Sequence, residues 1–255
     1  EFFSPDLTAF VAGDPIIQID ADALTLPRSE RIQTIAQDLI GGQHHSLRTC
    51  RGTFCAVVYE NPSRRLHLIT DKLGIRPIYC WVSPDYIVFA TALRILEAVS
   101  FCKKSINLQG VAETACYGYP LSDRTPYQNI FSLLAGEVVS IDAHGLQRQK
   151  YWRWDELPVP AASDAPPSER LYRHFLDAVK VRLGGQKVAA AFLSGGLDSR
   201  AIVAALKGAG AKIFTANFGP LGSQDQVLGQ LAADRLGSHH SYLQQRPLVD
   251  GDPYS

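Results

Sequence analysis

The segment 188–206 joins two apolar runs through a short polar, glycine-rich interruption. Residues 188–193 are small and apolar without alternation, which predicts a strand covered on both faces. Residues 194–196 (Ser-Gly-Gly) interrupt this strand with residues that tolerate unusual backbone angles. Asp198 and Ser199 fit the cap and first turn of a following helix. The pattern therefore predicts a buried strand, a glycine-rich turn and a helix.

The same alternation of helix and strand extends to both sides of this segment. Ser168 is placed to cap a helix with an apolar stripe, 211–219 predicts a second buried strand, and 224–236 has apolar residues at helical spacing. This order predicts a doubly wound parallel α/β sheet. Its ligand crevice is expected at the carboxyl ends of the strands, at 193–194 and 218–219.

The first part of the chain has a different pattern, dominated by pairs of short strands. Three hairpins are predicted, at 51–60 with 65–71, 76–82 with 86–92, and 136–142 with 146–152. Two helices are expected at 29–40 and 107–116, with Ser29 and Asn107 as caps. These elements predict an α+β sandwich.

A proline-rich segment separates the two patterns. Residues 156–168, ELPVPAASDAPPS, hold four prolines among small and polar residues and show no hydrophobic periodicity. We therefore predict a first domain over 1–155, a linker over 156–168 and a second domain over 169–255.

Composition narrows the class of protein. The 255 residues have a formal net charge of zero, so nothing favours a nucleic-acid partner or an anionic membrane. No apolar run approaches a membrane span and no signal-peptide pattern is found. The five cysteines lack metal-binding spacing and are interpreted as reduced core thiols, which favours a cytoplasmic location. The chain contains no methionine, so we expect that it does not start at its genetic start.

The turn at 194–199 has the chemistry of a phosphate site. Unpaired backbone N–H groups at a helix start, together with the helix dipole, bind anions. The hydroxyls of Ser194 and Ser199 add donors, and the Asp198 carboxylate is suited to Mg²⁺. The alternative is an ordinary strand–turn–helix corner. The string matches neither G-x-x-x-x-G-K-[ST] nor G-x-G-x-x-G.

The string Ser-Gly-Gly-Leu-Asp-Ser resembles the pyrophosphate loop of the N-type ATP pyrophosphatases. The rest of the chain narrows this resemblance to the asparagine synthetase family. Its first part is similar to the glutaminase-type domain of that family, and its second part to the synthetase domain. The segments that carry the similarity are 52–55, 70–79, 89–91 and 118–141 in the first part, and 192–200, 218–225 and 236–241 in the second.

The resemblance implies a fold and a reaction. The first domain is expected to be N-terminal nucleophile hydrolase-like, and the second a Rossmann-like ATP pyrophosphatase domain. ATP and Mg²⁺ are the implied cofactors, and the partners are a small-molecule carboxylate and an amine or ammonia donor. The carboxylate is activated as an acyl-adenylate with release of pyrophosphate; aspartate is the default substrate and asparagine the product. A homodimer is left open.

The resemblance also implies residue roles. Asp198 is the expected Mg²⁺ ligand. The full set of expected ATP-binding residues is Leu193, Ser194, Gly195, Gly196, Asp198, Ser199, Arg200, Phe218 and Gly219.

Two departures from the family pattern matter. Glutaminase activity needs an N-terminal cysteine, whereas the chain begins Glu1-Phe2-Phe3, and no N-G-E-like turn is recognised between Phe10 and Arg28. The first domain is therefore predicted not to hydrolyse glutamine, because of missing residues or because the chain resembles β-lactam synthetases and lasso-peptide cyclases. The family's second Mg²⁺ ligand is expected beyond Ser255. The alternative is a non-catalytic nucleotide-binding or interaction module.

Several polar residues keep two interpretations. Arg200 contacts the phosphates or is a solvated helix arginine, and Asp225 is a site acid or a helix N-terminal carboxylate. His239 and His240 are interpreted as surface or strand-start residues rather than catalytic or ligand residues. His44 and His45 are expected in a loop. Asp71 is expected to form a turn.

Overall fold

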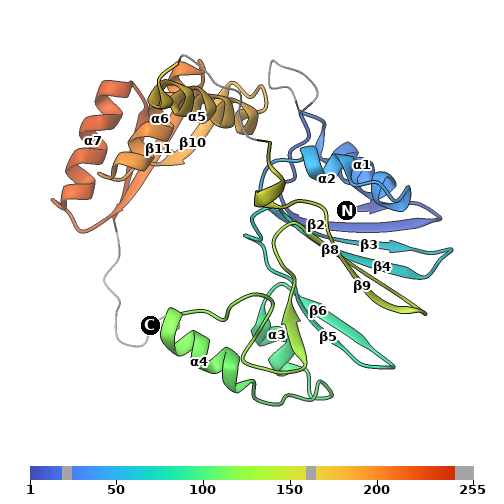
Figure 1. Cartoon of the computed structure of the whole chain (residues 1–255). Coiled ribbons are helices and arrows are strands. Elements are labelled where there is room, and N and C mark those ends of the chain that lie inside the picture. Colours follow the sequence, from blue (N-terminus) through green and yellow to red (C-terminus); the bar gives the residue numbers. More distant parts are fainter. Residues whose placement is uncertain (19–24, 159–164, 245–255) are drawn as a thin grey trace. The chain divides into compact units, whose positions relative to one another are not determined.

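The computed structural model describes residues 1–18, 25–158 and 165–244. The chain forms two compact units (Figure 1). Unit 1 comprises Glu1–Ile17 and Leu26–Ala161, and unit 2 comprises Gln18–Thr25 and Ala162–Ser255. The main boundary falls inside the segment predicted as the linker, although 159–164 lie outside the described residues.

Unit 1 contains two antiparallel sheets. The larger one has six strands in the order β1-β2-β3-β4-β8-β9, and the smaller one has three in the order β6-β5-β7. The strands of the larger sheet are β1 (Phe2–Phe3), β2 (Leu7–Gly13), β3 (Phe54–Glu60), β4 (Arg65–Thr70), β8 (Glu137–Asp142) and β9 (Gly145–Lys150). Those of the smaller sheet are β5 (Tyr79–Val82), β6 (Ile87–Ala90) and β7 (Ile130–Ser132).

The alternation of side chains along these strands builds a layered sandwich. On one face of the larger sheet, Phe54 and Val58 pack with Ile32 and Ile35 of α1 (Arg28–Ile40). On the other face, Cys55 and its neighbours pack against the smaller sheet. Each fully buried aliphatic side chain contributes about 1.5–3 kcal/mol to folding. The α+β sandwich predicted for the first part is confirmed.

Shorter helices complete unit 1. They are α2 (His45–Thr49), α3 (Leu93–Ala98), α4 (Leu108–Tyr117) and the 3₁₀ turn Trp154–Glu156. Leu96 of α3 packs with Trp81 on the outer face of the smaller sheet. Figure 1 shows α1 and α2 together on one side of the larger sheet.

The sequence predictions for unit 1 are mostly confirmed. All three hairpins form, as β3–β4, β5–β6 and β8–β9. Asn107 caps α4 by accepting a hydrogen bond from the N–H of Gly110 at 3.2 Å. Two predictions are wrong: Pro27 rather than Ser29 precedes α1, and His45 begins α2 instead of lying in a loop. His44 directly precedes that helix.

Asp71 forms a turn, as predicted. Its carboxylate is 1% exposed and accepts hydrogen bonds from the backbone N–H of Phe54 at 3.1 Å and of Leu73 at 2.8 Å. A buried carboxylate is tolerated when backbone donors satisfy it. The side chain therefore fixes the turn between β4 and β5 to the start of β3.

Glu113 of α4 should make unit 1 sensitive to acid. Its carboxylate accepts hydrogen bonds from Arg124 and from the Leu121 N–H at 2.8 Å, and these contacts lower its pKa to about 2. Because the pKa is depressed, this contribution to stability is complete above pH 4.5, its ordinary value, and is lost as the pH falls toward 2.

We expect Glu113→Gln to remove this dependence. Melting temperatures measured from pH 5 down to about pH 2 should fall less steeply for this variant than for the wild type. Asp85→Asn, at an exposed acid of the same unit, serves as control and should keep the wild-type slope. Equal slopes for the wild type and Glu113→Gln would contradict this role.

Unit 2 is built on a parallel sheet with the strand order β10-β11-β12. Its elements are α5 (Pro167–Leu183), β10 (Val188–Phe192), α6 (Leu197–Gly208), β11 (Lys212–Gly219), α7 (Gln224–Leu236) and β12 (His239–Gln244). Pro166 rather than Ser168 precedes α5, with proline also at its first position, where the missing N–H costs nothing.

The helices that follow β10 and β11 pack on the same face of this sheet. Val203 of α6 and Ala233 of α7 join one buried cluster with Leu193 and Ile213. The side chains that alternate to the opposite face are exposed: Val188, Phe192, Phe214, Phe218 and Leu243. A parallel α/β unit is therefore observed, whereas the doubly wound arrangement with helices on both faces stays a prediction.

The remaining general predictions concern the cysteines and the membrane. Four cysteines are buried and Cys116 is exposed, and all five are free thiols. Burial raises the pKa of Cys50 and of Cys80 to about 12, so both stay protonated near neutral pH. Among the helices of the described ranges, none is long and apolar enough to cross a membrane.

Candidate functional site

The glycine-rich turn predicted at 194–199 lies between the end of β10 and the start of α6. The Leu193 N–H donates to the Ala216 carbonyl at 2.8 Å, so pairing with β11 continues one residue past β10. Gly196 is the N-cap of α6, and no side-chain hydrogen bond caps this end of the helix. The helix therefore starts at Leu197, immediately after the paired glycines.

Two serine hydroxyls organise the turn from inside. The Ser199 Oγ accepts a hydrogen bond from the Ser194 N–H at 3.1 Å, and the two hydroxyl oxygens lie 3.0 Å apart. The Ser194 hydroxyl also accepts from the Gly196 N–H at 3.2 Å. The serines thus satisfy two of the turn's own donors, the N–H groups of Ser194 and Gly196.

The first N–H groups of α6 remain available. No helical acceptor exists for the first backbone donors of a helix, and over residues 1–18, 25–158 and 165–244 none is found for the N–H of Leu197 or Asp198. These donors stand at the positive end of the helix dipole. The geometry is that of an anion site.

Asp198 lies in the first turn of α6 with an exposed side chain. In the part of the chain that the structure describes, this carboxylate has no ion-pair partner, and no group of three or more acidic, histidine or cysteine side chains gathers to hold a metal. Mg²⁺ is commonly held by one or two carboxylates together with substrate phosphates. A single free carboxylate beside an anion site fits that pattern.

Arg200 lies against the same turn. Its Nε donates to the Gly196 carbonyl at 3.1 Å, and the side chain is exposed. This bond places the guanidinium next to the loop, whereas its contact with a phosphate stays a prediction.

The end of β11 lies beside the end of β10. The rings of Phe192 and Phe218 meet edge to face with centroids 5.9 Å apart, and Phe218 is 64% exposed. Gly219 has φ +145°, and its carbonyl accepts a hydrogen bond from the Tyr242 hydroxyl. The structure therefore brings all the predicted ATP-binding residues to one edge of the sheet.

Two residues that the sequence analysis passed over connect α7 to this edge. Asn217 of β11 is 4% exposed, and its Nδ2 donates to the backbone carbonyls of Asp225 and Gln226 at 3.3 and 3.4 Å. A Cβ on Gly229 would lie 2.6 Å from the Leu193 carbonyl oxygen, so only glycine allows this approach of α7. A polar residue in a buried strand and a glycine inside a helix were the available signals.

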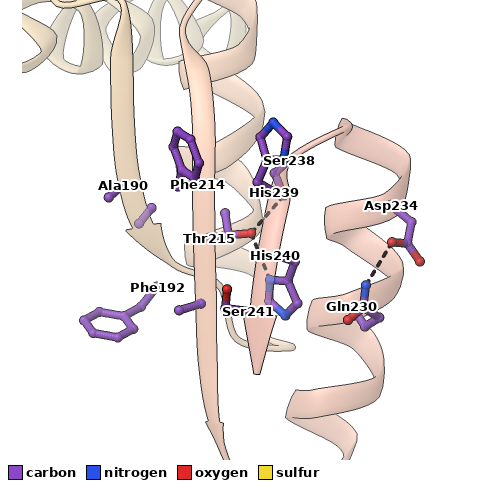
Figure 2. Close-up of a pocket in the computed structure, with 12 residues that line it drawn as sticks. Ala190, Phe192, Phe214, Thr215, Gln230, Asp234, Ser238, His239, His240 and Ser241 are labelled. Atoms are coloured by element: carbon purple, nitrogen blue, oxygen red, sulfur yellow. Dashed lines mark hydrogen bonds between the residues drawn. The ribbon is translucent and has the colours of Figure 1, made fainter. Parts of the chain in front are cut away.

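The pocket of Figure 2 also lies in unit 2, but its lining residues differ from those of the turn at 194–199. It measures about 710 Å³ and is lined by β10, β11, α7 and the start of β12. Within it, Thr215 contacts both the Ser238 hydroxyl and the His240 Nδ1 at 2.8 Å. Burial lowers the pKa of His240. None of the predicted ATP-binding residues lines this pocket.

The paired histidines lie where the strand-start interpretation placed them. β12 begins at His239, whose ring stacks on Phe214 at 5.1 Å. His240 points to the helix-covered side, toward Thr215. The strand-start prediction is confirmed.

Comparisons with known proteins match both units. The family model described as glutamine amidotransferase domain matches residues 33–152, and that described as asparagine synthase matches residues 170–250. A Methanocaldococcus jannaschii protein, provisionally named a glutamine-hydrolysing asparagine synthetase 2, is 27% identical over 76% of this chain and 39% of its own length. Asparagine synthetase (glutamine-hydrolysing) 3 of Bacillus subtilis is 25% identical over 71% of this chain and 30% of its own.

A further relative has a different name. Amidase chyE of Penicillium rubens is 26% identical over 60% of this chain and 23% of its own length. The chain thus spans between 23% and 39% of the length of these three relatives.

A sandwich with a glutamine amidotransferase domain match, followed by a parallel α/β unit with an asparagine synthase match, defines a two-domain arrangement of the amidotransferase–synthetase class. The chain belongs to the asparagine synthetase family.

Proposed function

We propose that the complete protein is an ATP-dependent amide ligase that activates a carboxylate as an acyl-adenylate, with aspartate as the default substrate. The observation that carries this proposal is the turn at 194–199, where serine hydroxyls hold the loop and leave the first N–H groups of α6 free. Membership of the asparagine synthetase family supports ATP as the ligand of this turn.

In the proposed reaction, the turn binds the β- and γ-phosphates of ATP. A carboxylate oxygen attacks the α-phosphorus, the bond from that phosphorus to the bridging oxygen breaks, and pyrophosphate leaves. An amine or ammonia then attacks the acyl carbon, loses a proton and displaces AMP. The donors of α6 and the Ser194 and Ser199 hydroxyls stabilise the charge that accumulates on pyrophosphate.

Asp198 would hold Mg²⁺, which when bound offsets the charge of the phosphates. The exposed ring of Phe218, together with backbone groups near Leu193 and Gly219, would contact the adenine. Arg200 is placed by its bond to Gly196 to add a positive charge beside the phosphates.

The nitrogen donor is a separate part of the proposal. Two of the curated relatives carry names that include glutamine hydrolysis, which supports ammonia from glutamine. None of the five cysteines of this chain is suited to attack glutamine by the N-terminal thiol route, since four are buried in the cores of unit 1 and Cys116 lies within α4.

A second candidate is amide formation on a carboxylate other than aspartate. The match to a Penicillium rubens protein named as an amidase favours it, because it shows that similarity to this chain extends beyond proteins named asparagine synthetase. Both candidates use the same turn and the same adenylation step.

The test follows an oxygen atom. The full-length protein is incubated with ATP, Mg²⁺, ammonia and aspartate labelled with ¹⁸O in its carboxylates. Adenylation requires one labelled oxygen to appear in AMP, with pyrophosphate released in equal amount. Label in inorganic phosphate together with ADP would overturn the adenylate. Turnover of other labelled carboxylates but not of aspartate would favour the second candidate.

A further inference from the structure

We propose that Asp225 is a positioning residue of the phosphate-binding turn, acting on it from the following helix. Its Oδ1 accepts a hydrogen bond from the Gly195 N–H at 3.1 Å. The inference rests on the proposed function, because it assigns Asp225 a role in binding ATP at that turn.

The turn and the first turn of α7 are in direct contact. A Cβ on Gly195 would lie 2.9 Å from the Asp225 Oδ1 and 3.2 Å from both the Asp225 Cα and the Gln224 carbonyl oxygen. These distances are shorter than ordinary carbon contacts, so a side chain at position 195 would displace the Asp225 carboxylate and crowd the backbone of α7. α7 thus forms one wall of the turn.

The start of α7 is itself held in place by hydrogen bonds from β11 and from its own N-cap residue. Asn217, buried in β11, donates to the carbonyls of Asp225 and Gln226, and Ser223 caps the helix by accepting from the Gln226 N–H. The absence of a side chain at Gly229 lets α7 lie against Leu193 at the end of β10. Asp225 therefore presents its carboxylate from a fixed backbone.

The hydrogen bond from Gly195 to Asp225 affects which backbone N–H groups of the turn are free to bind a phosphate. The Asp225 carboxylate accepts a hydrogen bond from the Gly195 N–H, and the Ser194 hydroxyl accepts one from the Gly196 N–H. With both glycine donors engaged inside the turn, the loop curls so that the donors of Leu197 and Asp198 at the start of α6 are open to the anion. Asp225 touches the loop rather than the phosphate, so its effect is on binding geometry.

The experiment compares two substitutions of Asp225 in the full-length protein. Asp225→Ala removes the acceptor and should raise the Kd for MgATP about tenfold, the usual cost of a lost hydrogen bond to a charged group. Asp225→Asn keeps an acceptor oxygen and should restore the Kd to within about twofold. Asp234→Ala, at an acid in the last turn of the same helix that contacts Gln230, is the matched control.

Amide hydrogen exchange of residues 194–199 without nucleotide gives an independent measurement. Exchange should quicken in Asp225→Ala and stay near the wild-type rate in Asp225→Asn. An unchanged Kd in Asp225→Ala would overturn the positioning role. A tighter Kd would also overturn it and would indicate that the carboxylate competes with phosphate. An equal weakening in both variants would overturn it as well and would indicate an effect of charge. If the wild type binds no MgATP, the proposed function fails, while unchanged exchange in Asp225→Ala is what defeats the role of Asp225.

Discussion

Replacing Asp198 with alanine should lower ATP-dependent pyrophosphate release by the full-length protein at least about 100-fold, the usual size of losing one charge-stabilising group in an active site. The exposed carboxylate stands in the first turn of α6, next to the donors that would receive the phosphates. Without Asp198, the first turn of α6 has no carboxylate to hold Mg²⁺ beside the phosphates.

The matched control is Asp177→Ala on α5. Asp177 is also an exposed helix acid, but it lies outside the turn and should leave pyrophosphate release unchanged. Asp198→Asn should be as inactive as Asp198→Ala, because an amide carries no charge for the metal. Pyrophosphate release retained in Asp198→Ala would remove Asp198 from the site.

The second large effect is expected on stability, at Arg148 in β9. Its guanidinium donates to both carboxylate oxygens of Glu137, at 2.8 and 2.9 Å, and Glu137 is 3% exposed. The same guanidinium lies 5.1 Å from the ring of Phe131 in the smaller sheet. The hydrogen bonds to Glu137 raise the pKa of Arg148, so the guanidinium stays positively charged.

Arg148→Met would leave the Glu137 carboxylate buried without its cation, which should lower the free energy of unfolding by about 3 kcal/mol. The double variant Arg148→Met/Glu137→Gln removes the stranded charge and should recover part of that loss. Urea unfolding of the wild type, both single variants and the double variant measures the coupling. A loss below about 0.5 kcal/mol in Arg148→Met, the range of an ordinary surface substitution, would contradict this account of the pair.

Most of the fold of both units could be predicted from local pattern. The three hairpins are marked by turn residues between apolar runs, and the strands and helices of unit 2 have clear periodicity. β2 and β7 were not predicted, because their partners are distant in sequence: β2 pairs with β3, and β7 pairs with β5. Their stability comes from neighbouring strands, which local composition does not reveal.

The candidate site shows the same division. The residues of the turn itself could be found, because serine, glycine and aspartate at a strand–helix junction have a direct chemical meaning. Asn217 and Gly229 could not, since their roles depend on how closely α7 approaches the end of β10. Arg148 escaped for a similar reason: its partner Glu137 lies on the adjacent strand of a hairpin, and only the register brings them together.

Calorimetric titration of the full-length protein with MgATP shows whether the turn at 194–199 binds ATP. The wild type should bind one MgATP per chain. Gly195→Ala should bind MgATP more weakly, because its Cβ would lie 2.9 Å from the Asp225 carboxylate and 3.2 Å from the backbone of α7. Gly208→Ala, at a glycine of α6 whose Cβ would meet no atom within 4 Å, should bind like the wild type. Absence of binding by the wild type, or equal affinity in Gly195→Ala, would contradict ATP binding at this turn.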